Sequence, residues 1–192
     1  MNFSIFVALL SEMKSLFSPR NILILVLVLF NAGCDQVSKV IVRERIEYNE
    51  HIEVVSDYFT LTKIENTGAF LSLGHSLPNW LRIILLLSLP MIVIAAALYY
   101  ILTRKELSMF LVTGICFALG GGIGNIYDRI VYGSVTDFMH MDFGLFRTGI
   151  FNFGDVSITI GIIMILLHSI FAKKTPESPE SNPENSNAST PQ

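Results

Sequence analysis

Two aspartates in the C-terminal part of the chain, Asp137 and Asp155, are its best candidates for proton transfer. Taken singly, Asp137 fits a turn acid, and Asp155 fits an acid in the first turn of a helix, where the helix dipole favours it. Both flank apolar stretches at one expected membrane boundary. Two carboxylates brought together there cannot both ionise cheaply, so one keeps its proton near neutral pH. Such a pair can activate a water with one acid and protonate a leaving amine with the other.

A second polar group precedes Asp137. Asn125, Asp128 and Arg129 are spaced i, i+3 and i+4, and they share a helix face if the helix continues that far. A buried Asp128–Arg129 ion pair is the simplest structural explanation. Desolvation of such a pair can cost more than its attraction returns. We therefore favour a scaffold that organises the helix ends around a reacting group.

Asp35 and Lys39 are four residues apart and can pair on one helix face. The pair has two explanations at this point. It anchors the outer end of a helix at the interface, or it positions other polar groups or a ligand at that depth.

The elements that carry these residues are membrane helices. The 192 residues are 52% hydrophobic and only 15% charged, with a mean hydropathy of +0.56, whereas soluble domains carry about 25% charged residues. Four segments are long and apolar enough to cross about 30 Å of hydrocarbon, and only helices or closed barrels satisfy the backbone there. The predicted spans are residues 21–42, 80–102, 107–126 and 153–171.

Basic residues set the expected orientation. Positive residues favour the cytoplasm, and they flank the predicted spans on one side at Lys14, Arg20, Arg104, Lys105, Lys173 and Lys174. We therefore expect both termini in the cytoplasm, with residues 1–20 as a cytoplasmic segment and 21–171 as the membrane domain. Residues 172–192 are rich in Pro, Ser, Asn and Glu, and we expect a disordered cytoplasmic tail.

The segment between the first two spans has β character. Alternation predicts short strands over Ile52–Val55 and Tyr58–Lys63, and Asn66-Thr67-Gly68 predicts a turn. The predicted fold is an all-α membrane protein of four transmembrane helices, with a small β-rich extracytoplasmic insertion between the first and second.

Other chemistries find less support. A metal site formed by His140 and Asp142 with Asp137 and Asp155 is one alternative. Their spacing matches no strong metal motif, and we expect neither a metal nor another cofactor. Gly120 and Gly124 suit close helix packing. The net charge of −3 argues against a nucleic-acid partner.

Five ordered blocks of the sequence resemble a known family, the bacterial lipoprotein signal peptidases (signal peptidase II), which are aspartic endopeptidases. The similarity covers residues 30–171, and five blocks in order are far more specific than any single motif. The blocks are Asp35-Gln36-Val37-Ser38-Lys39, Asn66-Thr67-Gly68-Ala69-Phe70, Gly124-Asn125-Ile126-Tyr127-Asp128-Arg129, Val135-Thr136-Asp137-Phe138 and Phe151-Asn152-Phe153-Gly154-Asp155.

The resemblance implies an inner-membrane enzyme with its active site at the outer face. Asp137 and Asp155 would be the catalytic pair. The residues that would support the site or contact substrate are Asp35, Lys39, Asn66, Gly68, Asn125, Arg129 and Asn152, with Asp128 in the same cluster. The substrate would be a prolipoprotein signal peptide whose cleavage-box cysteine carries diacylglyceryl, cut before that cysteine. Membrane lipid would be the other partner, and we expect a monomer.

The resemblance has one departure, because the family usually has alanine where Gly154 stands here. Glycine is also small, which preserves packing, although it lowers helix propensity by up to about 1 kcal/mol.

Three other functions fit the sequence less well. A small transporter usually shows internal repeats or broken helices at the midplane, and no repeat is visible. A purely structural membrane protein has no need of so many polar groups at one depth. Asn31-Ala32-Gly33-Cys34 superficially resembles a lipoprotein cleavage box, although Asn31 occupies a position where that box prefers a leucine-type residue, and we expect the first helix to be retained.

Overall fold

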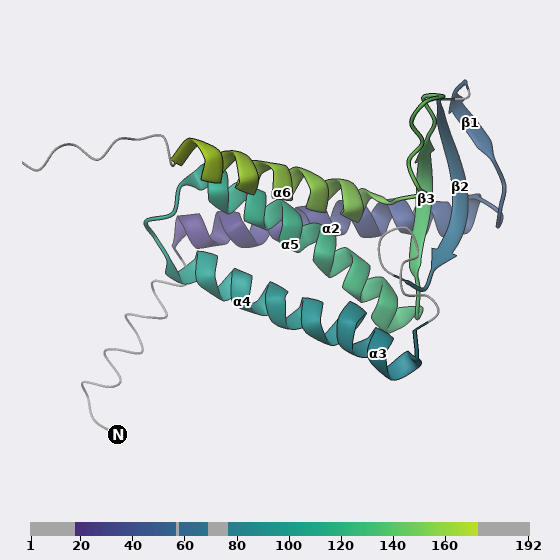
Figure 1. Cartoon of the computed structure of the whole chain (residues 1–192). Helices are drawn as coiled ribbons and strands as arrows, with labels where there is room; N and C mark the ends of the chain where they lie inside the picture. The colour runs from purple at the N-terminus through teal and green to yellow at the C-terminus, as the bar shows by residue number, and fades with distance from the viewer. Residues whose placement is uncertain (1–17, 57, 69–76, 173–192) are drawn as a thin grey trace, which may run out of the picture.

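The computed structural model describes residues 18–56, 58–68 and 77–172 as a bundle of long helices with a small sheet at one end (Figure 1). The predicted segment 1–20 and tail 172–192 lie almost entirely outside this part of the chain. The elements are α2 (Pro19–Arg45), β1 (Ile52–Val55), β2 (Phe59–Asn66), α3 (Asn79–Ile83), a π-helical segment (Ile84–Ser88), α4 (Leu89–Thr103), α5 (Met109–Val131), β3 (Val135–Met141) and α6 (Phe153–Ala172).

The four predicted membrane spans are confirmed as helices. Within the described residues, the stretches that are long and apolar enough to cross a membrane are Pro19–Arg45, Asn79–Thr103, Met109–Val131 and Phe153–Ala172. The first and third extend beyond their predicted outer ends, so α5 carries Asp128 and Arg129 within its last turns. Helix α2 also runs without a break through Cys34, as a retained first helix requires.

Helix α2 shows how the sequence builds the bundle. Ser18 caps its start by accepting a hydrogen bond from the Asn21 backbone N–H, and Pro19 occupies the first turn, where its missing N–H costs nothing. Large apolar side chains such as Leu29 and Phe30 stay exposed on the opposite face. The buried face changes from apolar to polar toward the sheet, through Asn21, Ile24, Val28, Asn31, Asp35, Lys39 and Val42.

Small residues bring α5 against its neighbours, which confirms the packing role predicted for Gly120 and Gly124. A Cβ at Gly120 would lie 2.8 Å from the Val28 carbonyl oxygen of α2, and one at Gly124 would collide with the Asp35 carboxylate. On the α6 side, a Cβ at Gly154 would lie 2.9 Å from the Gly121 carbonyl oxygen. This close approach suits glycine at position 154, where the family that the sequence resembles usually has alanine.

The sheet has three antiparallel strands in the order β1-β2-β3. The first two match the predicted strands, although β2 runs on to Asn66. Strand β3 was not predicted, and it pairs with β2 so that Asp137 lies opposite Ile64. Its first four residues are all buried, so it lacks the alternation by which a half-exposed strand is recognised.

The sheet lies beyond the ends of α2 and α5 and the start of α6 (Figure 1). Strand β3 is also hydrogen-bonded to the segment that leads into α6, with Met139 and Phe151 exchanging N–H···O bonds of 2.8 and 2.9 Å. This pairing fixes the start of α6 beside β3. It therefore brings the two aspartates of the predicted pair into one region.

Candidate active site

Asn152 joins Asp137 and Asp155. Its side-chain Nδ2 donates to Asp137 Oδ1 at 2.6 Å, and its backbone N–H donates to Asp155 Oδ2 at 3.2 Å. Its side-chain oxygen accepts from the Asp155 backbone N–H at 3.0 Å. One fully buried residue thus binds both carboxylates.

Asp137 is held by two amides in a nearly dry position. Asn66 Nδ2 donates to Asp137 Oδ2 at 2.9 Å, and only 2% of the residue is exposed. The pKa of Asp137 is raised to about 6, chiefly by burial and also by the charge of nearby Asp155, while the hydrogen bonds from Asn66 and Asn152 partly oppose the rise. Asp137 therefore holds a proton closer to neutral pH than a solvent-exposed aspartate does.

Asp155 is tied to a network deeper in the bundle. Asn125 Nδ2 donates to Asp155 Oδ1 at 3.0 Å, and Asn125 Oδ1 accepts from Lys39 Nζ at 2.8 Å. The amide of Asn125 can take only one orientation in this chain of bonds, because a lysine has donors alone, so the Asn125 oxygen must face Lys39 and its NH2 group must face Asp155. Asp155 is thus oriented as a hydrogen-bond acceptor.

Lys39 is the centre of the buried charges. Its Nζ lies 2.8 Å from Asp35 Oδ2 and 3.1 Å from Asp128 Oδ2, and all three side chains are fully buried. Arg43 Nη2 adds a second cation 2.9 Å from Asp128 Oδ1. The predicted Asp35–Lys39 pair therefore forms, and it positions other polar groups inside the bundle.

Asp35 also fixes the start of α6. Its Oδ1 accepts from the Gly154 backbone N–H at 2.7 Å, next to Asp155 in sequence. The N–H groups of the first helical turn lack partners within their helix. Asp35 satisfies one of them and so ties α2 directly to the segment that carries Asp155.

The simplest explanation for Asp128 and Arg129, an ion pair between them, is wrong. Asp128 points to α2, where Lys39 and Arg43 bind it, because these cations offset its burial more fully. Arg129 instead donates from Nη2 to the Gly68 carbonyl at 2.9 Å and from Nη1 to the Asn125 carbonyl at 3.2 Å. Gly68 itself donates its N–H to Asn66 Oδ1 at 2.9 Å, in the predicted turn.

The structure thus joins every predicted site residue into one connected region. It also adds residues that sequence reasoning did not assign. Ser157 Oγ donates to Asn31 Oδ1 at 2.9 Å. The four-residue spacing of Asn31, Asp35 and Lys39 is a sequence signal that could have placed Asn31 on this face. The other additions are Gln36, which donates to Asp35 and Asp128, and Arg43 and Glu65, which both bind Thr136.

Two cavities open on the aspartates from different sides. One of about 300 Å³ is lined by Ile64, Asn66, Asp137, His140, Thr148, Gly149 and Ile150. The other, of about 540 Å³ and mostly apolar, includes Asp155 and follows α6 through Val156, Thr159 and Ile160. The pair can therefore be reached both from the sheet and along a helix that faces lipid.

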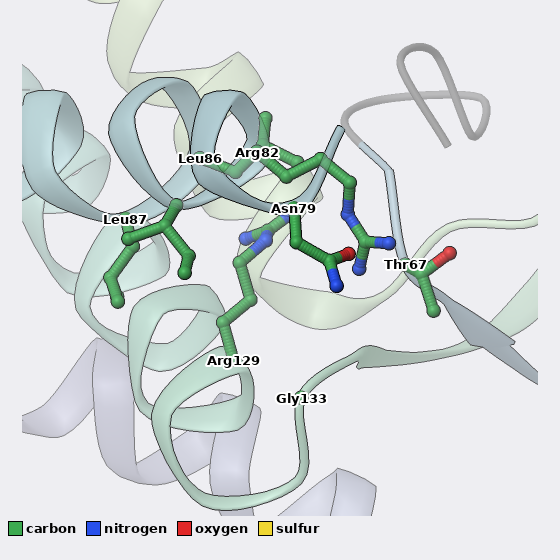
Figure 2. A pocket seen from close by; sticks show the side chains of 8 residues that line it. Thr67, Asn79, Arg82, Leu86, Leu87, Arg129 and Gly133 are labelled. Atoms are coloured by element: carbon green, nitrogen blue, oxygen red, sulfur yellow. The ribbon is translucent and has the colours of Figure 1, made fainter. Parts of the chain in front are cut away.

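A third cavity, of about 250 Å³, lies between Arg129 of α5 and the residues of α3 and the π-helical segment. In Figure 2 the side chains of Asn79, Arg82 and Arg129 converge on it, with Thr67 across from them. Ile83, Leu86 and Leu87 form its apolar side. The Nε atoms of Arg82 and Arg129 are buried and have no hydrogen-bond partner in the described part of the chain.

The residues of the metal alternative do not converge. Among the described residues, no three His, Cys, Asp or Glu side chains are grouped closely enough to hold a metal ion. Asp142 instead binds Arg147 at 2.7 Å. His140 lines the cavity beside Asp137.

Comparison with known proteins gives one family. The family model described as signal peptidase (SPase) II matches residues 23–171. A lipoprotein signal peptidase of Pseudomonas fluorescens is 36% identical over 80% of this chain and 91% of its own length, and one of Streptococcus thermophilus is 34% identical over 77% and 92%. A solved structure described as a bacterial membrane enzyme superimposes with a TM-score of 0.69 at 25% identity, over 79% of this chain and 94% of that one.

Replacing Lys39 should destabilise the bundle strongly. Lys39→Met keeps most of the side-chain volume but leaves Asp35 and Asp128 with less compensating charge, a loss of about 3–5 kcal/mol for a broken buried pair. Thermal unfolding in detergent should show a much lower midpoint than for Lys105→Met, because Lys105 is exposed. Adding Asp35→Asn to Lys39→Met should recover part of the loss. Equal midpoints for the two lysine variants would contradict the central role of Lys39.

Proposed function

The chain belongs to the signal peptidase II family, and we propose that it cleaves prolipoproteins by an aspartic mechanism, before a cysteine that carries diacylglyceryl. As a family member it is a bacterial membrane protease that removes signal peptides from prolipoproteins. The observation that carries the aspartic mechanism is that Asn152 donates one hydrogen bond to Asp137 and another to Asp155.

The two carboxyls differ in the way that acid–base catalysis needs. Asp155 accepts hydrogen bonds from the Asn125 side chain and from the Asn152 backbone N–H, which hold its oxygens in place close to Asp137. The pKa of Asp137 is raised to about 6, chiefly by burial. We therefore assign the proton of the pair to Asp137 and the role of base to Asp155.

The reaction then needs no covalent enzyme intermediate. Asp155 takes a proton from water, whose oxygen adds to the scissile carbonyl carbon, while Asp137 protonates the carbonyl oxygen. In the second step Asp155 gives its proton to the leaving amine nitrogen, one hydroxyl of the gem-diol intermediate gives its proton to Asp137, and the C–N bond breaks, so that both carboxyls return to their starting states. The signal peptide leaves with a new carboxylate, and the mature protein keeps its modified cysteine with a free amine.

The surrounding surfaces support a lipid-borne substrate. The apolar cavity along α6 gives a helical signal peptide a route from lipid to Asp155. The cavity of Figure 2 joins unsatisfied guanidinium donors to leucine side chains, and a glycerolipid likewise joins ester oxygens to acyl chains. We assign the diacylglyceryl group to this cavity.

Orientation follows from charge. With both termini in the cytoplasm, the sheet and the aspartate pair lie at the outer face of the inner membrane, where exported precursors are processed. We propose that one copy of the chain carries the whole site. Its parts would be the membrane domain 21–171, the cytoplasmic segment 1–20 and the cytoplasmic tail 172–192.

Asp137→Asn and Asp155→Asn should each lower cleavage of a diacylated precursor to below about 1% of wild type, because asparagine keeps the shape but cannot exchange a proton. A gel assay on purified enzyme measures this, and unfolding midpoints test integrity. Glu53→Gln on exposed β1 should retain full activity.

Chelation provides a further control for the same assay. EDTA should leave wild-type activity unchanged, since two carboxyls and water suffice. Loss with EDTA and recovery with added zinc would favour the metal alternative of His140 and Asp142 instead.

The activity should fall as pH rises through the pKa of Asp137, because the pair then loses its shared proton. The free-enzyme profile of kcat/KM should therefore have a basic limb that begins at about pH 6. Asn66→Leu removes a bond that favours the ionised form, so its limb should move to higher pH even if its maximum rate falls. A shift to lower pH would show that Asp137 is not the acid.

The precursor should be cut only when its cysteine carries diacylglyceryl. Arg82→Leu should lower kcat/KM for the modified precursor by about 10-fold or more, because a charged hydrogen-bond donor is lost. Arg104→Leu, in an exposed arginine directly after α4 and so at the opposite end of the same membrane span, is the matched control. Equal cleavage of modified and unmodified precursors would contradict the lipid assignment.

Topology can be measured independently of activity. Reporter fusions after Lys105 and Lys174 should report the cytoplasm, and fusions at Glu53 and Gly144 should report the outside. The reverse pattern would place the aspartates on the side where no exported precursor arrives.

A further inference from the structure

The 300 Å³ cavity borders Asp137, and the hydrogen bonds that position Asp137 and Asp155 form without any group bound in it. Asp137 and Asn66 form its inner wall, and His140 and Thr148 form its polar outer wall. Ile64 and Ile150 supply apolar sides. A group that enters this cavity therefore lies next to the scissile bond and is enclosed by side chains on several sides.

His140 is the wall residue with spare hydrogen-bonding capacity. Its Nδ1 is buried and has no partner within the described ranges. Thr148, in contrast, already exchanges bonds with the Met141 backbone at 2.9 and 3.3 Å, and Asn66 is bound to Asp137. A buried polar atom without a partner costs free energy, so a ligand that supplies one is favoured.

The position of the cavity indicates which part of a substrate reaches it. The signal helix and the acyl chains lie in the bilayer, whereas this cavity lies between β2, β3 and the segment before α6, at the sheet end of the bundle. The polypeptide that follows the modified cysteine must leave the membrane on this side. Its first side chain after the cysteine is the one that lies within reach of both Asp137 and His140.

We infer that this cavity is a specificity subsite for the residue directly after the modified cysteine, and that His140 selects a small hydroxyl or carboxamide side chain there. This inference rests on the proposed function. A hydroxyl or carboxamide both donates and accepts, so it satisfies Nδ1 in either tautomer of the histidine. A cavity of about 300 Å³ also has room for larger side chains, so the preference for serine, threonine or asparagine rests on the hydrogen bond to His140.

The sheet continues this path outward. A neighbouring cavity is lined by His140, Asp142 and Arg147, together with Tyr58 and Thr60 of the β2 side. His140 belongs to both cavities. It therefore stands where the chain would pass from the enclosed subsite to the open surface of the sheet.

The test is a cycle of two precursors and several enzymes. Diacylated precursors with serine or alanine after the cysteine, otherwise identical, are cleaved by wild type, His140→Phe and His140→Gln. Wild type should prefer serine by about 3- to 10-fold in kcat/KM, the worth of one hydrogen bond. His140→Phe keeps an aromatic ring but has no ring nitrogen, so it should abolish the preference. His140→Gln restores a polar group that can form hydrogen bonds, so it should recover part of the preference. His51→Leu, in an exposed histidine before β1, should leave the preference unchanged.

A second pair of precursors, with threonine or valine after the cysteine, tests the hydrogen bond in wild type alone and does not depend on variant folding. Valine has nearly the shape of threonine but no hydroxyl, so its precursor should be cut about 3- to 10-fold more slowly. Equal rates on serine and alanine, a preference that survives His140→Phe, or equal rates on threonine and valine would each overturn the subsite. Failure of wild type to cut any diacylated precursor would overturn the proposed function and the subsite with it.

Discussion

The charge of Lys39, buried inside a membrane bundle, is the interaction on which the rest of the site depends. An ammonium group without water is stable only when anions and acceptors surround it. Asp35, Asp128 and Asn125 fill that role, and they come from two different helices. The packing of α2 against α5 is therefore fixed by charge as well as by small residues.

Backbone and amide groups connect that central cluster to the aspartate pair. Asp35 holds the Gly154 backbone, and Asn125 passes from Lys39 to Asp155, so the start of α6 has little freedom. Asn152 then extends the same hydrogen-bond network to Asp137 on β3. Preorganised hydrogen bonds of this kind place charge where a reaction needs it without rearrangement at the moment of reaction. Substitutions far from the aspartates can thus act on them.

Toward the sheet, the bundle is polar inside and apolar on its surface, because its surroundings in the membrane are lipid. Helix α2 carries both kinds of residue there, with Leu29 and Phe30 exposed and Asn31, Asp35 and Lys39 buried. The cavities around the aspartates differ accordingly. The one along α6 is mostly apolar, and the one under the sheet has a polar wall, which suits a substrate that is half in lipid and half outside.

Composition alone predicts the four helices, because a run of apolar residues of bilayer length has no other stable form in lipid, apart from strands of a closed barrel. The sequence by itself also determined the Asp35–Lys39 pair, since i,i+4 spacing is local, and the ordered motifs selected both aspartates. Only the tertiary structure decided that Asp128 binds Lys39 and Arg43 instead of Arg129, and that β3 pairs with β2. Those contacts join residues far apart in the chain, where the competing partners are chosen by burial and by the geometry of packed helices. The cavity of His140 belongs to the same class, because its walls come from three segments that meet only in the folded protein.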